Sequence, residues 1–421
     1  MIILRLALHS LRNRRITALL TIFSITLSVI MLLGVEKIRT GTKASFLNTI
    51  AGTDLIVGAR AGDVQLLLYS VFRIGAATAN ITWKTVEDIK GRPEVKWVVP
   101  IALGDSHRGF RVMGTSSDYF DHYRFRRNQS LEFSSGKRFD DLFEAVVGHK
   151  VAQQLGYKVG SEIVVAHGSG RVSFGANHDD KPFVVSGILK PTGTPVDQTV
   201  HLKMEAIAAI HVGWENGSAP RGDDITSAKL VRQLDLNPQS ATALYVGLKS
   251  RMMTFSFQRW VNTYQPEAIS AILPGIAFGQ LWNILGNVEV ALLAISAMVV
   301  FTAFLGMVIS VLGSLNERRR EMAILRSVGA GPTQVFGLLL SEAAILVLAG
   351  ICNGVLANFG ILYFGRAVIE NFTGLSLNLE LITIPEAKLM AGIFVGGMVA
   401  AIVPAIRAYR LSLSDGLTIR T

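Results

Sequence analysis

The sequence has little cysteine and none of the common signatures of catalysis. Its only cysteine is Cys352, which lies in an apolar run of this chain of 421 residues. One thiol excludes an intramolecular disulfide and a metal site built from several cysteines. The chain also has no G-x-S-x-G, H-E-x-x-H or G-x-x-x-x-G-K-[ST] motif. Because the last motif binds nucleotide phosphates, we expect a chain that is not an enzyme, has no catalytic residues and does not hydrolyse ATP by itself.

Charged residues are also scarce, and they are unevenly placed. They make up 17% of the chain, against 50% hydrophobic residues and a mean hydropathy of +0.41, which exceeds the usual value for a soluble domain. The net charge is +10, and residues 1–15, 314–333 and 407–421 hold eleven arginines against three acidic residues, so +8 of it lies there. All three stretches adjoin apolar runs. This pattern is typical of cytoplasmic loops of a membrane protein and argues against binding of nucleic acid.

Four apolar runs are long enough to cross the hydrocarbon layer, which takes about 20 helical residues. The expected spans are residues 16–35, 288–313, 334–365 and 389–406. A cleaved signal peptide is the alternative for the first run, but the run is longer than a normal signal sequence and no A-x-A-like site follows it. We therefore predict four uncleaved transmembrane helices.

The arginines predict how these helices are oriented. They precede the first span, separate the second from the third and follow the fourth, whereas the connection 366–388 has only Arg366 and Lys388 as basic residues. Basic residues accumulate on the cytoplasmic side, so we expect cytoplasmic termini and residues 38–285 on the outer side of the membrane. The predicted fold is a helical membrane protein with an α+β extracytoplasmic domain inserted between helices 1 and 2.

Two of the helices are predicted to be longer than the membrane is thick. Residues 16–50 contain no proline or strong turn signal and would span roughly 52 Å as one helix, and a helix starting after Pro274 would span roughly 57 Å. Both would extend some 20 Å beyond the hydrocarbon, and stiff helices of this kind can carry movement to an outer domain. A kink followed by a surface helix is the alternative in each case.

The predicted organisation follows the order of the chain. Its segments are a cytoplasmic amphipathic helix (1–15), helix 1 with a stalk (16–50), a periplasmic domain (51–274), a stalk with helix 2 (275–313), a cytoplasmic coupling loop (314–333), helix 3 (334–365), a short periplasmic loop (366–388), helix 4 (389–407) and a cytoplasmic tail (408–421). In the periplasmic domain we expect strands near 55–57, 95–100, 110–113, 145–147, 162–165, 183–189 and 199–202, and helices near 83–90, 151–155 and 204–210.

Seven of the eight histidines fall in the periplasmic domain. His167, His178, Asp179 and Asp180 flank one candidate hairpin. Imidazole and carboxylate groups together suit zinc or a similar divalent ion. Because the spacing matches no standard ligand pattern, loop residues exposed to solvent are the alternative interpretation.

The segment between spans two and three combines helical and stop signals. Met322, Leu325 and Val328 follow at roughly helical spacing, and Gly329 is a natural C-cap before Gly331-Pro332. A short amphipathic helix here could dock in a groove of a cytoplasmic partner. The alternative is a basic loop lying against lipid headgroups.

Three motifs resemble a known family. The segment NERRREMAILRSVGA is similar to the signature E-(I/M)-(A/G)-(I/L)-L-R-(A/S)-(V/L)-G-A that follows the second span of FtsX/MacB/LolC-LolE-like ABC transporter permeases. The tail PAIRAYRLSLSDGL and the start LALHSLRNRRITALLTIFSI resemble the ends of the same permeases, with Leu413 where proline is usual. VVGHKVAQQLGYKVGSEIVV and FVVSGILKPTGTPVDQTVHL resemble their MacB-like periplasmic core domain, and residues 288–415 would form the FtsX-like permease domain.

The resemblance implies partners and a mechanism. It implies a homodimer, or a dimer with a sister permease, in the lipids of a bacterial inner membrane. The dimer would be bound to a separate ATPase subunit that carries ATP and magnesium. A periplasmic adaptor or substrate-binding protein is a further implied partner. Movement of the ATPase would reach the periplasmic domain through the long helices (mechanotransmission) and drive export or extraction of a periplasmic or membrane substrate. The alternatives are a lipoprotein-releasing permease, a regulatory scaffold, transition-metal transport, or a membrane sensor without an ATPase.

The resemblance also assigns roles to particular residues. The positions that would form the coupling helix on the ATPase are Glu317, Arg318, Arg319, Glu321, Leu325, Arg326, Ser327 and Gly329. Glu342, early in span three, matches an acidic position of the family. A glutamate that faces the helix bundle or extends to the interface is the alternative for Glu342.

Overall fold

The computed structural model describes residues 2–47, 49–126, 128–167, 180–212, 228–317, 324, 327–373 and 382–410. The chain forms two compact units. One, here called the helical unit, comprises Met1–Gly41, Gly286–Asn371 and Leu377–Thr421. The other, the α+β unit, comprises Thr42–Leu285 and Phe372–Ser376.

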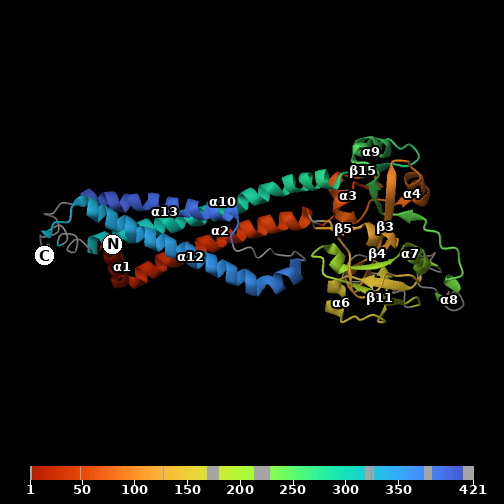
Figure 1. Cartoon of the computed structure of the whole chain (residues 1–421), viewed down its shortest axis with the longest axis horizontal. Coiled ribbons are helices and arrows are strands. Elements are labelled where there is room, and N and C mark those ends of the chain that lie inside the picture. Colours follow the sequence, from red (N-terminus) through yellow and green to blue (C-terminus); the bar gives the residue numbers. More distant parts are fainter. Residues whose placement is uncertain are drawn as a thin grey trace. The chain divides into compact units, whose positions relative to one another are not determined.

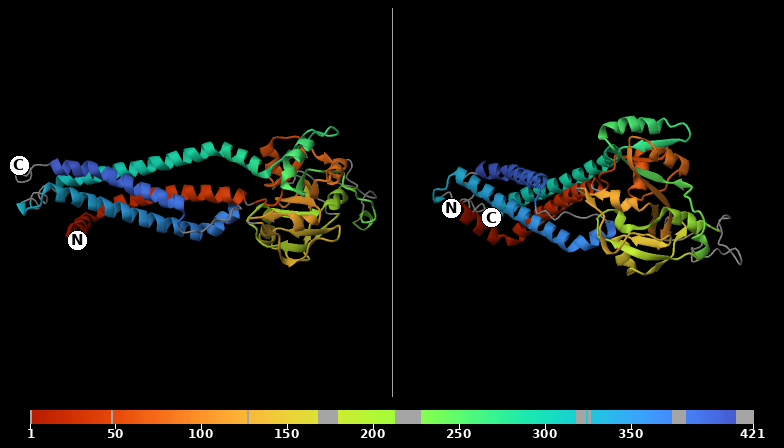
Figure 2. Two further views of the ribbon diagram at one scale, coloured as in Figure 1. Left: turned by 45° about the horizontal axis from the view of Figure 1, so that its top comes forward. Right: turned by 45° about the vertical axis from the view of Figure 1, so that its right-hand side comes forward.

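Long apolar helices lie side by side in the helical unit (Figures 1 and 2). After the short helix α1 (Ile2–Asn13) come α2 (Arg15–Leu47), α10 (Pro274–Glu317), α12 (Pro332–Thr373) and α13 (Ile384–Arg410). Among the described residues these last four are long and apolar enough to cross a membrane. The four expected spans are thus confirmed as helices.

Three of these helices are longer than a bilayer requires. α2 has 33 residues, α10 has 44 and α12 has 42. At about 1.5 Å per residue they measure roughly 50, 66 and 63 Å, against ~30 Å of hydrocarbon. The length of α12 differs from the prediction, since a loop was expected from residue 366 and the helix runs to Thr373. The first strong helix-ending residue after Gly365 is Gly374, so the chemistry of the intervening sequence permits this extension.

Small residues let the helices of this unit approach closely. A Cβ atom on Gly350 of α12 would come within 2.5 Å of Ile25 on α2, and one on Gly354 within 2.6 Å of Val29. Two glycines four residues apart therefore form a groove that receives two branched side chains of α2, as at close helix contacts in membranes. The hydroxyl of Thr26 donates to the carbonyl of Gly350 at 3.3 Å across the same contact.

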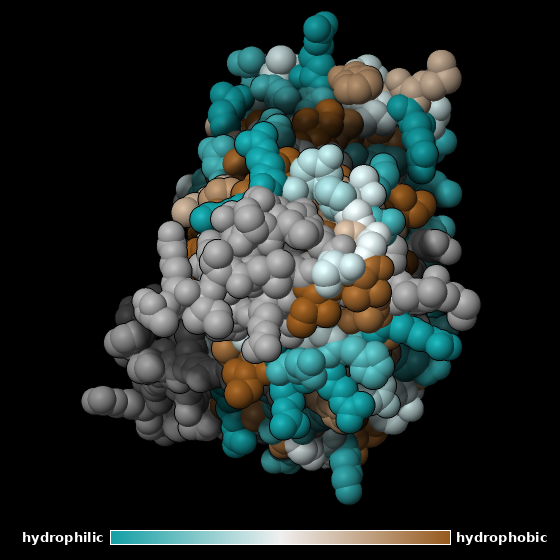
Figure 3. Space-filling model, turned by 90° about the vertical axis from the view of Figure 1, so that its left-hand side faces the viewer, coloured by the Kyte–Doolittle hydropathy of each residue, from teal (hydrophilic) through white to brown (hydrophobic). Residues whose placement is uncertain are grey.

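Outward side chains of the helical unit are largely apolar. Exposed examples on three helices are Phe23, Met298 and Phe364, as expected of a surface that faces lipid. Hydrophobic and hydrophilic side chains are both exposed on the face drawn in Figure 3.

The α+β unit is built on a mixed sheet. Among the residues described, eleven strands join it, in the order β15-β1-β14-β3-β4-β12-β8-β11-β7, with β10 beside β3 and β9 beside β11. Their bounds are β1 Leu55–Ala59, β3 Val95–His107, β4 Phe110–Thr115, β7 Phe133–Gly136, β8 Glu144–Val147, β9 Glu162–Ile163, β10 Ala166–His167, β11 Phe183–Leu189, β12 Thr199–Lys203, β14 Ala243–Leu248 and β15 Ile269–Ile272. β12–β4 and β11–β8 are parallel pairs, and the other pairs are antiparallel. Short pairs form from β2 (Ile81–Thr82) with β13 (Ser240–Ala241) and from β5 (Arg124–Phe125) with β6 (Gln129–Ser130).

Both faces of this sheet are buried, because alternate side chains enter different cores. On β12, Val200 and Leu202 join the core that contains α6 (His149–Leu155) and α7 (Met204–His211), whereas His201 is buried on the opposite face. On β14, Leu244 and Val246 join the core under α4 (Trp83–Lys90) and α9 (Thr254–Asn262). Tyr245 points the other way, into a core that includes α3 (Asp63–Ser70) and α5 (Asp118–His122). The short helix α8 (Ala228–Val231) completes the described elements of regular helix in this unit.

Candidate functional site: charged contacts among the long helices

Charged residues gather on α2 directly after its apolar stretch. Arg39 donates to both carboxylate oxygens of Glu36, from Nε at 2.9 Å and from Nη2 at 2.8 Å. Its Nη1 also pairs with the carboxylate of Glu289 on α10. Glu36 is almost fully buried, and a buried carboxylate needs such a bidentate partner to offset its lost hydration. A single arginine therefore pairs with two glutamates and ties α2 to α10.

A second ion pair ties α2 to α13. Lys37 Nζ lies 3.2 Å from Glu386 Oε1, and both side chains are nearly buried. The other carboxylate oxygen of Glu386 accepts from the backbone N–H of Thr383 at 2.8 Å. This Thr-x-x-Glu arrangement satisfies an amide at the start of α13, as one half of a capping box does. Glu386 thus both caps its own helix and holds the neighbouring one.

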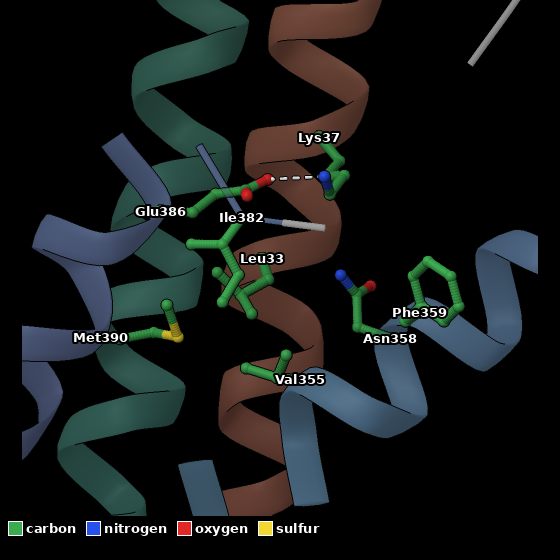
Figure 4. A pocket seen from close by; sticks show the side chains of 8 residues that line it. All are labelled: Leu33, Lys37, Val355, Asn358, Phe359, Ile382, Glu386 and Met390. Atoms are coloured by element: carbon green, nitrogen blue, oxygen red, sulfur yellow. Dashed lines mark ion pairs between the residues drawn. The ribbon is translucent and has the colours of Figure 1, made fainter. Parts of the chain in front are cut away.

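These groups border a small pocket, in which Lys37 and Glu386 point toward one another (Figure 4). The pocket is lined by Leu33, Lys37, Val355, Asn358, Phe359, Ile382, Glu386 and Met390. Its wall is mostly apolar, apart from this ion pair and the buried amide of Asn358 on α12. Such a wall keeps the local dielectric low, so loss of either charged partner would leave the other costly to bury. Sequence patterns assigned no functional role to any of these charged residues.

The predicted coupling segment is described only in part. Arg318, Arg319, Glu321, Leu325 and Arg326 lie outside the described residues, and for Glu317 only the backbone, at the end of α10, is described.

The described part of this segment ends as a helix should. The N–H of Val328 donates to the carbonyl of Ile324 at 3.1 Å, and Ser327 Oγ donates to the same carbonyl at 2.8 Å. Gly329 has φ of 103°, a conformation that favours glycine, which agrees with its prediction as a C-cap. The side chains of Ile324 and Val328, one helical turn apart, are 54% and 83% exposed. The segment therefore presents an apolar pair to solvent next to the start of α12 at Pro332.

Glu342 lies on α12 and is only 6% exposed. Its neighbours Leu339, Ala343 and Leu346 are buried too. This burial agrees with the interpretation of Glu342 as a glutamate that faces the helix bundle.

The structure describes the predicted metal ligands only in part. His167 ends β10, where its backbone pairs in register with Asp105, while His178 and Asp179 lie outside the described residues. The carboxylate of Asp180 lies 2.6 Å from Nζ of Lys181, which is fully buried and also donates to the carbonyl of Val212 at 3.0 Å. The carboxylate of Asp180 thus pairs with the buried ammonium group of Lys181. Within the described ranges no group of three or more metal-binding side chains occurs, and zinc binding stays a prediction.

Two family models match the chain. A MacB-like periplasmic core domain matches residues 18–240, and an FtsX-like permease C-terminal domain matches residues 293–413. Among solved structures, the periplasmic region of MacB from Actinobacillus actinomycetemcomitans is similar, with 10% identity, a TM-score of 0.35, and coverage of 56% of this chain and 95% of that chain. The extracellular domain of the noncanonic ABC-type transporter YknZ from Gram-positive bacteria matches with 16% identity, a TM-score of 0.30, and coverage of 52% and 98%. No curated protein sequence matches the chain.

Proposed function

Because the chain belongs to the MacB/FtsX-like family of ABC transporter permeases, we propose that it is a non-catalytic permease subunit driven by a separate ATPase. The observation that carries this proposal is the exposed pair Ile324 and Val328. Apolar side chains one helical turn apart, beside an arginine-rich stretch, suit a groove on a partner protein better than they suit water. The lack of a nucleotide-binding motif in the chain requires that partner to supply the ATP chemistry.

The proposed topology places the α+β unit outside the cytoplasm. It is one insertion between the first and second spans, and both termini and the coupling segment are cytoplasmic. The arginines beside the ends of the spans support this orientation. α10 supports it as well, since it runs without interruption from Pro274 to Glu317, immediately before the coupling segment.

The proposed mechanism transmits movement through the helices. Two copies of the chain, or one copy and a sister permease, bind two ATPase subunits, whose closure on ATP displaces the coupling segments. The ion pairs of Arg39 and Lys37 make α2, α10 and α13 respond together. Helices longer than the hydrocarbon layer then deliver the movement to the α+β unit, which acts on a substrate already outside the inner membrane.

Docking of the ATPase is tested by a charge in the apolar pair. The full chain is purified in mild detergent with the ATPase that accompanies it, and Val328→Asp is compared with Leu234→Asp, a change at an exposed leucine of the α+β unit. A loss of about 1.4 kcal/mol of binding free energy lowers affinity tenfold, so we expect far less ATPase with Val328→Asp and wild-type recovery with Leu234→Asp. Equal recovery with both variants would refute docking through this pair.

The topology is tested by cysteine labelling in intact cells. In a Cys352→Ser background, single cysteines replace Met252, which is 92% exposed in the α+β unit, and Val328. An impermeant maleimide should label position 252 directly and position 328 only after permeabilisation. The reverse pattern would contradict the proposed orientation.

Reconstitution of permease and ATPase in proteoliposomes tests the mechanism, because ATP-driven passage of a solute through the bilayer would contradict action on the outer side alone.

A further inference from the structure

Arg73 occupies an unusual position in the α+β unit. It follows α3, where the N–H of Ile74 donates to the carbonyl of Leu68 at 3.1 Å and turns the chain back. Its φ is 61°, a left-handed conformation that strains a residue with a side chain and is usually left to glycine. The fold nevertheless keeps an arginine there and turns its side chain inward, so that only 9% of it is exposed.

The guanidinium of Arg73 meets no negative charge. Nη1 lies 3.4 Å from the hydroxyl of Tyr245 on β14, and Nη2 lies 2.8 Å from the sulfur of Met113 on β4. Over the described parts of the chain, no carboxylate forms an ion pair with it. Burial raises the pKa of Tyr245 and of Tyr123, so both phenols stay neutral and supply no counter-charge. A buried positive charge of this kind is strongly unfavourable by itself.

Several polar atoms around Arg73 are also unpartnered. Arg73 Nε and the hydroxyl of Tyr119 are buried, and within the described structure neither has a hydrogen-bond partner. The same holds for Nε2 of His201. His201 and Tyr119 are both fully buried, with ring centroids 5.5 Å apart. Burial raises the pKa of Tyr119 and the guanidinium of Arg73 opposes this shift, so the two groups lie near one another in the core below α3 and α5 without a common acceptor.

His201 adds no second positive charge to this cluster. Its Nδ1 lies 3.1 Å from the carbonyl of Val146, and because a carbonyl only accepts, Nδ1 carries the proton. Burial and the neighbouring charge of Arg73 lower the pKa of His201 to about 3, so the ring is neutral. His201 thus leaves the positive charge of Arg73 in place, and Arg111 on β4 is a second cation nearby, since burial and the charge of Arg73 lower its pKa.

We propose that Arg73 and Tyr119 form a binding site for one small anion inside the α+β unit, with the hydroxyl of Tyr245 at its edge. A compact monoanion would accept hydrogen bonds from Arg73 Nε and from the Tyr119 hydroxyl, and it would neutralise the guanidinium. A water molecule can satisfy the same donors but cannot remove the charge. Because Arg73 and Tyr119 are buried in a packed core, the proposed occupant is an anion of halide size or one carboxylate group, and these two sources separate in the test below.

The test measures anion-dependent stability of the full chain in detergent. Thermal unfolding of the α+β unit is followed at constant ionic strength in gluconate, with chloride, bromide or formate added in parallel. For the wild type we expect a rise of about 5 to 11 °C when the anion exceeds its Kd a hundredfold. A response to halides alone assigns an inorganic anion, and a response to formate assigns the carboxylate of an organic ligand.

Matched variants locate the effect. Arg73→Met should fold in gluconate, because an apolar side chain of similar length replaces an unpaired charge, and it should lose the response to anions. Tyr119→Phe removes one hydroxyl and should weaken the response, whereas Arg251→Met, at an exposed arginine, should keep it in full. A wild type that ignores all three anions, as it would with water alone in the site, overturns the proposal. So does an unchanged response in Arg73→Met.

Discussion

Protonation of His201 should make the α+β unit lose stability in mild acid. Its pKa is about 3 in the folded chain against a usual value of 6.5, chiefly because the ring is buried and secondly because Arg73 is near. As the pH falls through 6.5, the ring of His201 takes up a proton in the unfolded chain. In the folded chain the same ring stays neutral down to about pH 3. The contribution of the neutral His201 ring to stability is therefore fully present above pH 6.5. It is lost progressively as the pH falls from 6.5 toward 3.

The size of the loss follows from the two pKa values. Between pH 7 and pH 5 the single ring accounts for about 2 kcal/mol of unfolding free energy, since each pH unit within the window contributes about 1.4 kcal/mol. For a unit of this size that corresponds to a fall in Tm of about 4 to 8 °C. The measurement is thermal unfolding of the full chain at both pH values, in gluconate buffer so that small anions are absent.

His201→Asn isolates the contribution of this residue. The asparagine amide can donate to the carbonyl of Val146 in place of Nδ1 but does not titrate, so the variant should lose about 2 kcal/mol less than the wild type on acidification. His149→Asn, at a half-buried histidine at the start of α6, should behave as the wild type does. If His201→Asn is as sensitive to acid as the wild type, the ring is not the group that takes up the proton, and the reasoning fails.

Two further predictions concern the helical unit. Glu386→Gln removes a buried carboxylate that pairs with Lys37 and should lower stability by about 3 kcal/mol, measured by thermal unfolding in nanodiscs. Gly350→Val places a Cβ within 2.5 Å of Ile25 and should lower stability by at least about 1 kcal/mol in the same assay, because α2 and α12 must separate.

Each of these variants has a control in the same helices. Lys37→Met combined with Glu386→Gln removes both charges of this ion pair and should recover part of the loss, and no recovery would mean that capping of α13 alone explains it. Gly360→Val lies on α12 where a Cβ meets nothing within 4 Å, so it should be near neutral. A similar loss at residues 350 and 360 would contradict close packing at Gly350.

The sequence predicted the long helices well, because a span of about 20 apolar residues has few other interpretations. It predicted seven strands of the α+β unit but missed β14, whose run ALYVGL is buried on both faces and lacks the alternation that marks a strand with one wet face. β15 was missed because four residues carry too little pattern.

The charged contacts were harder to predict than the helices. The arginine that ties α2 to α10 pairs with a glutamate 250 positions away, and Arg73 meets Tyr245 across 172 positions. Local patterns carry no information on such pairs, although Thr383-x-x-Glu386 was readable as the start of a helix. Pairing of Asp180 with Lys181 was equally hidden, since it depends on burial that a sequence does not display, and the metal hypothesis stays a prediction.

The contacts of α2 constrain how the helical unit can move. The helix is bound to α10 through Arg39, to α13 through Lys37, and to α12 through the glycine groove at Gly350 and Gly354. The two ion pairs lie within one helical turn of each other, whereas the groove contacts α2 further back, at Ile25 and Val29. A helix held at two levels cannot tilt alone without breaking a buried pair or lifting branched side chains from the groove, and each step costs several kcal/mol. Displacement of α2 together with its neighbours costs much less, so the packing favours concerted movement over independent movement of one helix.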